Sequence, residues 1–463
     1  MAAAAVVIAT PTLAGAAAPY PSDTHRPDVV PLLAGYRSFW VSDGVNDLHG
    51  RVADASTLAR DDRLVVWVNQ HATRAQKFKA LQDAEYQNAT NTSYDQSFTV
   101  STGMGSRISR LYVRGRNAGK LPLTSRLINS TDGTTGAYIS TDKAKATFSH
   151  PRPYLPSDPS TPAVAGDEAA CAPSVTNGSS QRSIRTGRPW ADARGNLRIT
   201  RLAPVTDRTH QFSPRSVVLD PGYGTVGLCR GGSFPSGHTT TAYEAGLTLA
   251  TLLPRFAPEL LARASENANN RLVVGVHYPL DLMGGRIDGE VALATRWADA
   301  KFRRQVLVPA RTELLRYLRA SCGHSLRRCT AHQRRYTSDP YGGARIPGGT
   351  SQVVTNRTSA VRVYRERMTY GFARTGRRHL APSVPQGASA LLRTVFPTLT
   401  RAQRTSVLAQ TQIASGFPLD QSGRRGSWQR LDLAAAMSAT VRVQRHGRVL
   451  VVATGGPARV VRG

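Results

Sequence analysis

The stretch Pro235-Ser236-Gly237-His238, directly ahead of the apolar segment Thr239 to Leu253, decides how this chain is interpreted. It places a flexible turn, a hydroxyl group and an imidazole at the start of an expected helix. Backbone N–H groups at a helix N-terminus have no partner within the helix and, together with the helix dipole, they favour an anion. The stretch therefore predicts a phosphate-binding turn.

Two further clusters add positive charge and a second imidazole. Upstream, Lys145 and Arg152 lie seven positions apart, and prolines on both sides of the arginine stiffen the chain there. Downstream, Arg271 is followed by His277 after six positions and by Asp281 after four more. Each cluster alone would be typical of a solvated loop or of a packed core segment. Their joint occurrence, in this order and at this spacing, indicates one site.

The three clusters resemble the signature of the type 2 phosphatidic acid phosphatase (PAP2) superfamily, which reads K-x6-R-P, P-S-G-H and S-R-x5-H-x3-D. Asn270 stands where the family usually has serine. The longer string Gly232 to Thr239 is similar to the signature of the soluble, secreted class A bacterial acid phosphatases, with Phe234 in place of the usual tyrosine. The resemblance implies an all-α, PAP2-type helical bundle and a phosphatase activity.

Phosphate binding is expected from three cations and a helix terminus. A phosphoryl group in transfer carries negative charge on its equatorial oxygens, so catalysis depends on positioning and on positive charge. Lys145, Arg152 and Arg271 are expected to supply that charge. The hydroxyl group of Ser236 and the N–H groups near Gly237 are expected to fill the remaining directions.

The catalytic roles follow from the resemblance. It implies that His277 is the nucleophile, which forms a phosphohistidine, and that His238 protonates the leaving alkoxide. Asp281 would hold His277 in the required tautomer by accepting its other ring N–H. Pro279 is expected to end the helix that carries Arg271 and to let a new helix begin around Asp281.

The start of the chain predicts export. Residues 1–18 have the composition of the apolar part of a secretory signal peptide, without the positively charged segment that normally precedes it. We expect a truncated signal peptide, with an apolar N-terminal tail as the alternative. No later stretch has about 18 consecutive apolar residues, so no transmembrane segment is expected in the mature chain. The predicted location is extracellular or cell-envelope associated.

The four cysteines are compatible with two disulfides. Cys322 and Cys329 are the easiest pair, which leaves Cys171 and Cys229 to close the segment between the first two clusters. Four cysteines allow three connectivities. A zinc site is the alternative, although the spacings match no familiar zinc finger.

Positive charge is concentrated in the last third of the chain. Residues 301–463 contain 29 Lys and Arg residues and five acidic residues, which is +24 of the formal net charge of +30. Such asymmetry indicates an anionic partner, for example a polymer of the cell surface, with a solvated basic surface as the alternative.

The resemblance implies a PAP2-like phosphatase domain over residues 19–305, and the concentration of positive charge sets apart a basic C-terminal extension over residues 306–463. Residues 154–230 are expected to be a long insertion at the mouth of the site, and residues 320–385 to be irregular. A β-hairpin is expected over Thr440 to Ala453 around His446-Gly447. The predicted helices are 61–86, 239–253, 257–269, 271–277, 281–304, 388–395, 401–413 and 428–437.

These observations predict a secreted, metal-independent phosphomonoesterase that needs no cofactor. The nearest alternative is a vanadium-dependent haloperoxidase, in which the same site would hold vanadate with His277 as its ligand. The 33 positions from His238 to Arg271 are a compact interval, which favours the phosphatase. A second alternative is a binding protein whose basic region docks on nucleic acid, polyphosphate or a cell-wall polymer.

Overall fold

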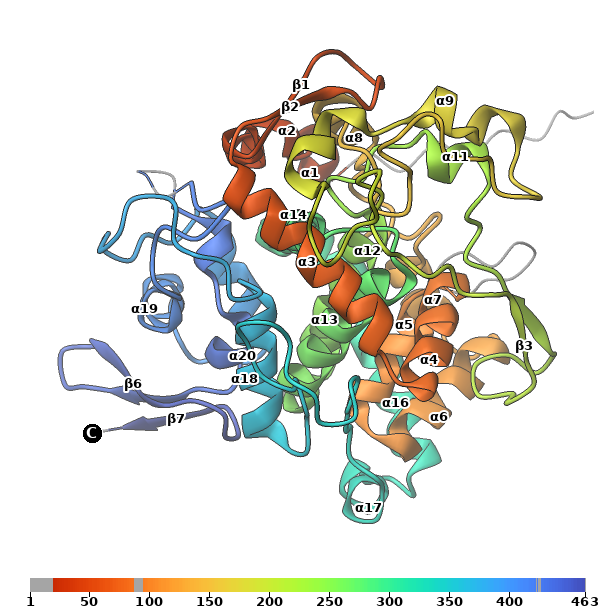
Figure 1. The fold of residues 1–463 in the computed structure, drawn as a ribbon. Helices are drawn as coiled ribbons and strands as arrows, with labels where there is room; N and C mark the ends of the chain where they lie inside the picture. The colour runs from red at the N-terminus through yellow and green to blue at the C-terminus, as the bar shows by residue number, and fades with distance from the viewer. Residues whose placement is uncertain (1–19, 87–94, 422, 424–425, 463) are drawn as a thin grey trace, which may run out of the picture.

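Three consecutive helices form the centre of the molecule in the computed structural model, which describes residues 20–86, 95–421, 423 and 426–462 (Figure 1). They are α12 (Gly237–Leu252), α13 (Ala257–Val274) and α14 (Pro279–Ala298). Almost every residue of α13 and α14 is buried. Small residues bring these helices close together: a Cβ atom on Gly246 would lie 2.6 Å from the Cβ atom of Ala264, and one on Gly285 would lie 2.5 Å from the carbonyl oxygen of Ser236.

Other helices surround this centre. Helices α4 to α7 lie on one side of α13, and α18 to α20 lie on the other (Figure 1). The longer surrounding helices are α3 (Ala55–His71), α4 (Arg74–Glu85), α6 (Ser106–Asn117), α7 (Pro122–Ile128), α8 (Asp142–Phe148), α16 (Val308–Ser321), α17 (Leu326–Ala331), α18 (Arg357–Arg367) and α19 (Arg401–Thr411). The short α-helices are α1 (Pro21–Thr24), α2 (Val29–Leu32), α5 (Ser97–Val100), α9 (Pro173–Thr176), α10 (Arg182–Arg185), α11 (Val226–Cys229), α15 (Ala300–Phe302) and α20 (Leu433–Ala436).

Single turns of other helix types connect these elements. The 3-10 turns are η1 (Ala34–Ser38), η2 (Ser101–Met104), η3 (Ala169–Cys171), η4 (Ser179–Gln181), η5 (Pro254–Phe256), η7 (Ala388–Leu392) and η8 (Trp428–Arg430). The π-helical turn η6 (Arg303–Leu307) continues directly into α16.

Three small sheets complete the fold. Strand β1 (Trp40–Ser42) pairs with β2 (Gly50–Val52), and β3 (Val205–Asp207) pairs with β4 (Val217–Leu219), both antiparallel. Near the C-terminus β5 (Thr440–Val443) pairs antiparallel with β6 (Val449–Ala453) and parallel with β7 (Arg459–Arg462). The fold is therefore mostly helical, as the sequence predicts. The β5–β6 pair lies in the segment Thr440 to Ala453 where a β-hairpin is expected, whereas β1 to β4 and β7 were not predicted.

The basic C-terminal part shares its hydrophobic core with the central helices. One cluster of buried side chains contains Leu247 and Leu260 of α12 and α13 together with Leu314, Tyr364 and Leu433 from beyond residue 306. Burial of one such side chain stabilises a fold by about 1.5–3 kcal/mol. Removing residues 306–463 would therefore open this core.

Several predicted helix boundaries were wrong. The segment 61–86 is two helices, because Thr73 caps α4 by accepting a hydrogen bond from the Gln76 N–H group at 3.1 Å. Helix α13 continues through residues 269 and 270 and ends at Val274, because Gly275 adopts a φ of +78°. His277 therefore lies in a linker, and Pro279 is the first residue of α14.

The other differences lie towards the C-terminus. Helix α14 ends at Ala298, where Asp299 begins the next turn as its N-cap. The segment 320–385, expected to be irregular, contains α17 and α18. The helix predicted over 428–437 is the 3-10 turn η8 followed by α20. The insertion 154–230 contains short helices and the β3–β4 pair.

The cysteines form the two predicted disulfides, Cys171–Cys229 and Cys322–Cys329. This pairing excludes the alternative of a zinc site made from the same four thiols. None of the described helices has the length and apolar character to cross a bilayer. The predicted signal peptide, residues 1–18, lies outside the described residues.

Candidate active site

Ser236 is the N-cap of α12 and fixes the first turn of that helix. Its hydroxyl oxygen accepts a hydrogen bond from the Thr239 N–H group at 3.2 Å, and its own N–H group donates to the carbonyl oxygen of Asp281 at 3.1 Å. The hydroxyl hydrogen of Ser236 stays available for a ligand. Gly237 and His238 follow at the first two helical positions, where backbone N–H groups have no acceptor within the helix. Both are only partly buried, so this end of α12 is reached from outside.

His277 and Asp281 form a hydrogen-bonded pair at the start of α14. Nδ1 of His277 lies 3.1 Å from Oδ2 of Asp281, and both side chains are buried. The same carboxylate oxygen accepts the Tyr278 N–H group at 2.8 Å, which caps α14. Because α14 begins at Pro279, Asp281 lies in its first turn and faces back toward His277.

Arg152 determines which nitrogen of His277 carries the proton. Nη1 of Arg152 lies 3.1 Å from Nε2 of His277 and also donates to the carbonyl oxygen of Val276 at 3.0 Å. An arginine can only donate, so Nε2 must accept and the ring proton must be on Nδ1, facing Asp281. Burial, and then Arg152, hold the pKa of His277 well below its usual range, which keeps the ring neutral. Nε2 therefore presents a lone pair.

Lys145 and Arg271 complete the cluster of cations. Nζ of Lys145 donates to the carbonyl oxygen of Gly232 at 2.8 Å, from the side of the turn that leads to Ser236. Arg271 is buried, and its Nε and Nη1 atoms have no hydrogen-bond partner among the described residues. Burial, and then the charge of Arg152, lower the pKa of Arg271 to about 9. Buried donors without partners are costly, so this guanidinium is suited to an anionic ligand.

His238 lies within the field of the same cations. Burial, and then the charges of Arg271, Arg152 and Lys145, lower its pKa well below the usual value. A hydrogen bond to the backbone of Ala84 acts in the opposite direction. His238 is therefore neutral while the site holds no anion. A bound phosphate would offset the three positive charges and raise the pKa of His238.

The structure thus brings all eight predicted residues together. Arg152, His277, Asp281 and Ser236 are linked by hydrogen bonds, while Lys145 contacts the residues just ahead of Ser236. Arg271 and His238 belong to the same electrostatic group. Burial raises the pKa of Asp281 to about 7, against the opposing effect of the Tyr278 N–H group and then of the nearby cations.

Three residues that the sequence analysis did not single out support Asp281. The Ser233 hydroxyl group lies 3.4 Å from Oδ1 of Asp281 and 3.0 Å from Nδ1 of His150. Nε2 of His150 lies 2.5 Å from Nε2 of Gln181 in the insertion. Ser233 and His150 lie inside the clusters quoted above, but nothing in their spacing links them to Asp281.

The insertion also fixes the backbone around His277. Arg185 on α10 forms a buried ion pair with Asp62 of α3 at 2.8 Å and donates to the Tyr278 hydroxyl group at 2.8 Å. Oδ1 of Asp61 accepts the Leu280 N–H group at 3.1 Å. The insertion therefore packs against the linker that carries His277, close to the site, as expected.

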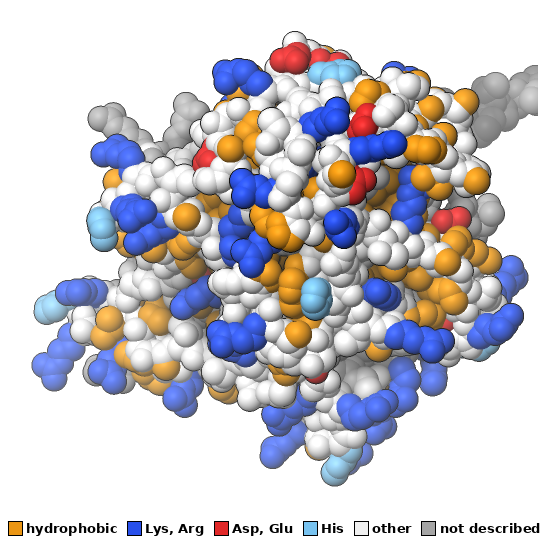
Figure 2. All heavy atoms as spheres, viewed as in Figure 1, with side chains coloured by type: hydrophobic (Ala, Val, Ile, Leu, Met, Phe, Trp, Pro, Cys, Tyr) orange, Lys and Arg blue, Asp and Glu red, His pale blue; other side chains and the backbone are white. Residues whose placement is uncertain are grey.

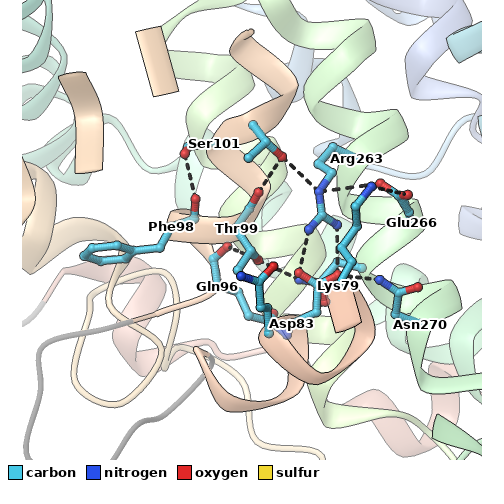
Figure 3. Close-up of polar contacts among 12 residues, drawn as sticks. Lys79, Asp83, Gln96, Phe98, Thr99, Ser101, Arg263, Glu266 and Asn270 are labelled. Atoms are coloured by element: carbon cyan, nitrogen blue, oxygen red, sulfur yellow. Dashed lines mark hydrogen bonds and ion pairs between the residues drawn. The ribbon is translucent and has the colours of Figure 1, made fainter. Parts of the chain in front are cut away.

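Asn270, at the position where serine was expected, belongs to a separate polar network (Figure 3). Its side chain donates to Oδ2 of Asp83 at 2.7 Å and accepts from Gln76 at 2.6 Å. The carboxylate of Asp83 also accepts hydrogen bonds from both terminal nitrogens of Arg263, at 3.0 and 2.6 Å. The negative charge of Asp83 raises the pKa of Arg271, so this network stabilises the charged form of that guanidinium.

Comparison with known proteins agrees with this geometry. Residues 132–304 match the family model described as the PAP2 superfamily. All eight site residues lie within the matched segment. Over residues 132–304 the chain is therefore similar to the PAP2 superfamily.

Similarity to individual proteins is confined to short segments. The chain is 40% identical over 88 residues to an acid phosphatase of Zymomonas mobilis, covering 19% of this chain and 33% of that protein. It is 32% identical over 79 residues to a non-specific acid phosphatase of Providencia stuartii, covering 17% and 32%. It is 42% identical over 53 residues to a lipid A 1-phosphatase of Rhizobium etli, covering 11% and 23%. The chain thus spans a third or less of the length of these relatives.

Proposed function

We propose that this chain is a secreted, metal-independent phosphatase that hydrolyses phosphomonoesters through a phosphohistidine on His277. The observation that carries the proposal is the buried guanidinium of Arg271, whose Nε and Nη1 atoms have no partner within the described residues. Its positive charge, like that of Arg152, lowers the pKa of His277, so the two guanidinium groups and the imidazole lie close together. The names of the similar proteins, two acid phosphatases and a lipid A 1-phosphatase, support the same class of reaction.

In the first step, the Nε2 lone pair of His277 attacks phosphorus. An N–P bond forms while the P–O bond to the alcohol breaks, and the electron pair of that bond leaves with the alkoxide oxygen. Asp281 accepts the Nδ1–H group and stabilises the positive charge that develops on the ring. Arg271, Arg152 and Lys145 stabilise the equatorial oxygens, so the chain itself provides the positive charge that a metal ion would otherwise supply.

His238 is the proposed acid. The negative charge of the bound phosphate raises the pKa of His238, so that the ring is protonated. His238 then donates this proton to the leaving alkoxide oxygen and becomes neutral. In the second step a water molecule attacks the phosphohistidine, His238 takes a proton from that water, and the N–P bond breaks. Phosphate leaves and His277 regains its neutral form.

Secretion is supported by the apolar composition of residues 1–18 and by the two disulfides, which are typical of proteins from oxidising compartments. The surface in Figure 2 shows many Lys and Arg side chains and few acidic ones. Six exposed arginines stand in pairs at 327–328, 334–335 and 377–378. We include in the proposal that this basic surface attaches the enzyme to an anionic polymer of the cell surface.

An assay of the purified mature protein on a panel of phosphomonoesters, with EDTA present, tests the proposal. We expect release of phosphate that EDTA leaves unchanged and that vanadate inhibits competitively, because the site suits a trigonal-bipyramidal oxyanion. A parallel assay with vanadate, peroxide and halide tests the haloperoxidase alternative, in which the same cations would hold vanadate and Nε2 of His277 would bind it. Halide oxidation without phosphatase activity would reject our proposal.

A further inference from the structure

A cavity of about 650 Å³ lies where the end of α14 meets the C-terminal part of the chain. Five arginines line it: Arg303 and Arg304 from the π-helical turn, Arg311 from α16, Arg393 after η7, and Arg404 from α19. No aspartate or glutamate lines the cavity. Its walls therefore combine a strong positive charge with no internal counter-charge.

Three of these arginines donate to backbone oxygens, and none of the five is paired with a carboxylate of a described residue. Arg404 donates to the carbonyl oxygens of Ser389 and Leu399, and Arg311 donates to that of Leu252 at 3.2 Å. Arg303 donates to the carbonyl oxygen of Trp297. None of the five takes part in an ion pair between described residues.

The nearby carboxylate of Asp299 offsets only part of this charge. It raises the pKa of Arg303, but its oxygens already accept hydrogen bonds from Ser22 and from the N–H groups of Lys301 and Phe302. Burial, and then the charge of Arg393, lower the pKa of Arg303 and of Arg404. The guanidinium groups thus repel one another across the cavity.

Two buried polar groups that line the same cavity have no partner among the described residues. They are the indole Nε1–H group of Trp297, whose side chain is 1% exposed, and the Oγ1 atom of Thr394. A buried donor without a partner costs about 1–3 kcal/mol unless a ligand or ordered water satisfies it. The cavity therefore offers neutral donors as well as cations.

We propose that this cavity binds a compact polyanion that carries two or more linked phosphate groups. Each arginine presents a planar fork that matches two phosphate oxygens, and several forks around one cavity favour a ligand with several phosphate groups. The apolar side chains of Leu307 and Leu399 line the remaining wall. The cavity is a second site: Asp281 and Trp297 are 16 residues apart on α14, an axial distance of about 24 Å.

Linked phosphates could come from a free oligophosphate or from the phosphate chain of a nucleotide. The probe for the first source is methylenebisphosphonate, whose P–C–P link cannot be hydrolysed at the candidate active site. The probe for the second is adenosine α,β-methylene diphosphate. Tighter binding of the nucleotide analogue would assign the apolar wall to the base, and equal binding would assign the site to the phosphate groups alone.

Calorimetric titration of the full chain with methylenebisphosphonate tests the proposal. The double variant Arg304→Glu with Arg393→Glu reverses two exposed charges of the cavity and should bind the probe at least about tenfold more weakly. The matched control is Arg316→Glu with Arg401→Glu, two exposed positions on the neighbouring α16 and α19 that do not line the cavity. The control should bind within about twofold of the wild type.

A third variant, Arg271→Gln, separates this cavity from the candidate active site, and it should retain binding of the probe. Loss of binding in Arg271→Gln, with binding retained in the cavity double variant, would assign the anion to the active site and overturn the proposal. If the cavity and control double variants bind the probe equally weakly, the loss of affinity reflects net charge, and the proposal is overturned. Absence of probe binding by the wild type would also overturn the proposal. Equal unfolding temperatures of the variants serve as the check on folding.

Discussion

Nη1 of Arg152 lies 3.1 Å from Nε2 of His277, on the ring edge opposite Asp281. The same guanidinium is thus positioned to bind phosphate and to occupy the lone pair that would attack it. An incoming phosphate provides a stronger acceptor for Arg152 than a neutral imidazole does, because hydrogen bonds between charged groups are the stronger ones. Binding of the substrate would therefore free the nucleophile.

His277→Ala should lower kcat at least about 10³-fold, because it removes the proposed nucleophile. Acid quenching of the wild type during turnover of a ³²P-labelled substrate should trap acid-labile label on His277. The matched control is His446→Ala, an exposed histidine in the turn between β5 and β6, which should keep full activity. Label on Ser236, or an active His277→Ala variant, would contradict the mechanism.

His238→Gln should lower kcat about 10²-fold or more for alkyl phosphates, which need a proton on the leaving oxygen. The loss should be less than about tenfold for p-nitrophenyl phosphate, whose leaving group departs without help. Comparing kcat for the two substrates measures this difference. An equal loss on both would show that His238 has a different role.

Asp281→Asn should lower activity but stabilise the fold at higher pH. The pKa of Asp281 in the folded chain is about 7, above its ordinary value of 3.8, so the folded state binds this proton more tightly than the unfolded state does. Stability conferred by the protonated carboxyl is thus lost as the pH rises from about 4 to about 7.

An asparagine cannot ionise, so the variant avoids that loss. Between pH 5 and pH 8 its free energy of unfolding should gain on the order of 2 kcal/mol relative to the wild type. Urea unfolding at both pH values measures the change, and the exposed position Asp142→Asn is the control. A difference between variant and wild type that does not change with pH would mean that Asp281 stays ionised throughout this range.

Ser233→Ala should lower kcat about three- to tenfold with little change in KM, because Ser233 acts through Asp281 and does not contact the substrate. The hydrogen bond from Ser233 lowers the pKa of Asp281, so its loss should raise that pKa above about 7. The acid limb of the kcat/KM profile should then move to higher pH.

Ser233→Thr keeps the hydroxyl group and should restore the wild-type profile, while Ser179→Ala, at an exposed position, should leave it unchanged. A lower kcat without any movement of the acid limb would indicate only a packing effect.

Charge reversal at the exposed pairs Arg327-Arg328, Arg334-Arg335 and Arg377-Arg378 should lower the salt concentration at which the protein elutes from an anionic cell-wall resin or from heparin. Such attraction is screened within about 8 Å at physiological salt, so retention should fall steeply as ionic strength rises. Phosphatase activity should not change, because these residues lie outside the segment 145–281. Elution at the wild-type salt concentration would show that the basic region is only a solvated surface.

The sequence predicted the site more closely than it predicted the helices. The eight residues could be grouped because their order and spacing resemble the PAP2 signature and because phosphate chemistry requires residues of these types. The predicted end of α13 at residue 269 was wrong. Asn269 and Asn270 weaken helical periodicity in the sequence, but their side chains have buried tertiary partners in Tyr341 and Asp83. Contacts between residues far apart in the sequence determine whether such residues are helical, and the local sequence pattern carries no information about these contacts.

The supporting residues of the insertion were unpredictable for the same reason. Gln181 and Arg185 lie in a segment without periodicity, and their partners His150 and Asp62 are 31 and 123 positions away. The break between α3 and α4, by contrast, carried a local signal in Thr73, whose capping hydrogen bond to the Gln76 N–H group follows a familiar spacing.

The disulfide Cys171–Cys229 encloses both Gln181 and Arg185, the two side chains through which the insertion supports His150 and the linker of His277. Closing a loop of 58 residues removes about 4 kcal/mol of chain entropy from the unfolded state. A chain whose thiols stay reduced would lack that tether. Reduction of this one cysteine pair would therefore loosen the support of the His277 linker, which couples the geometry of the site to the redox state of the compartment.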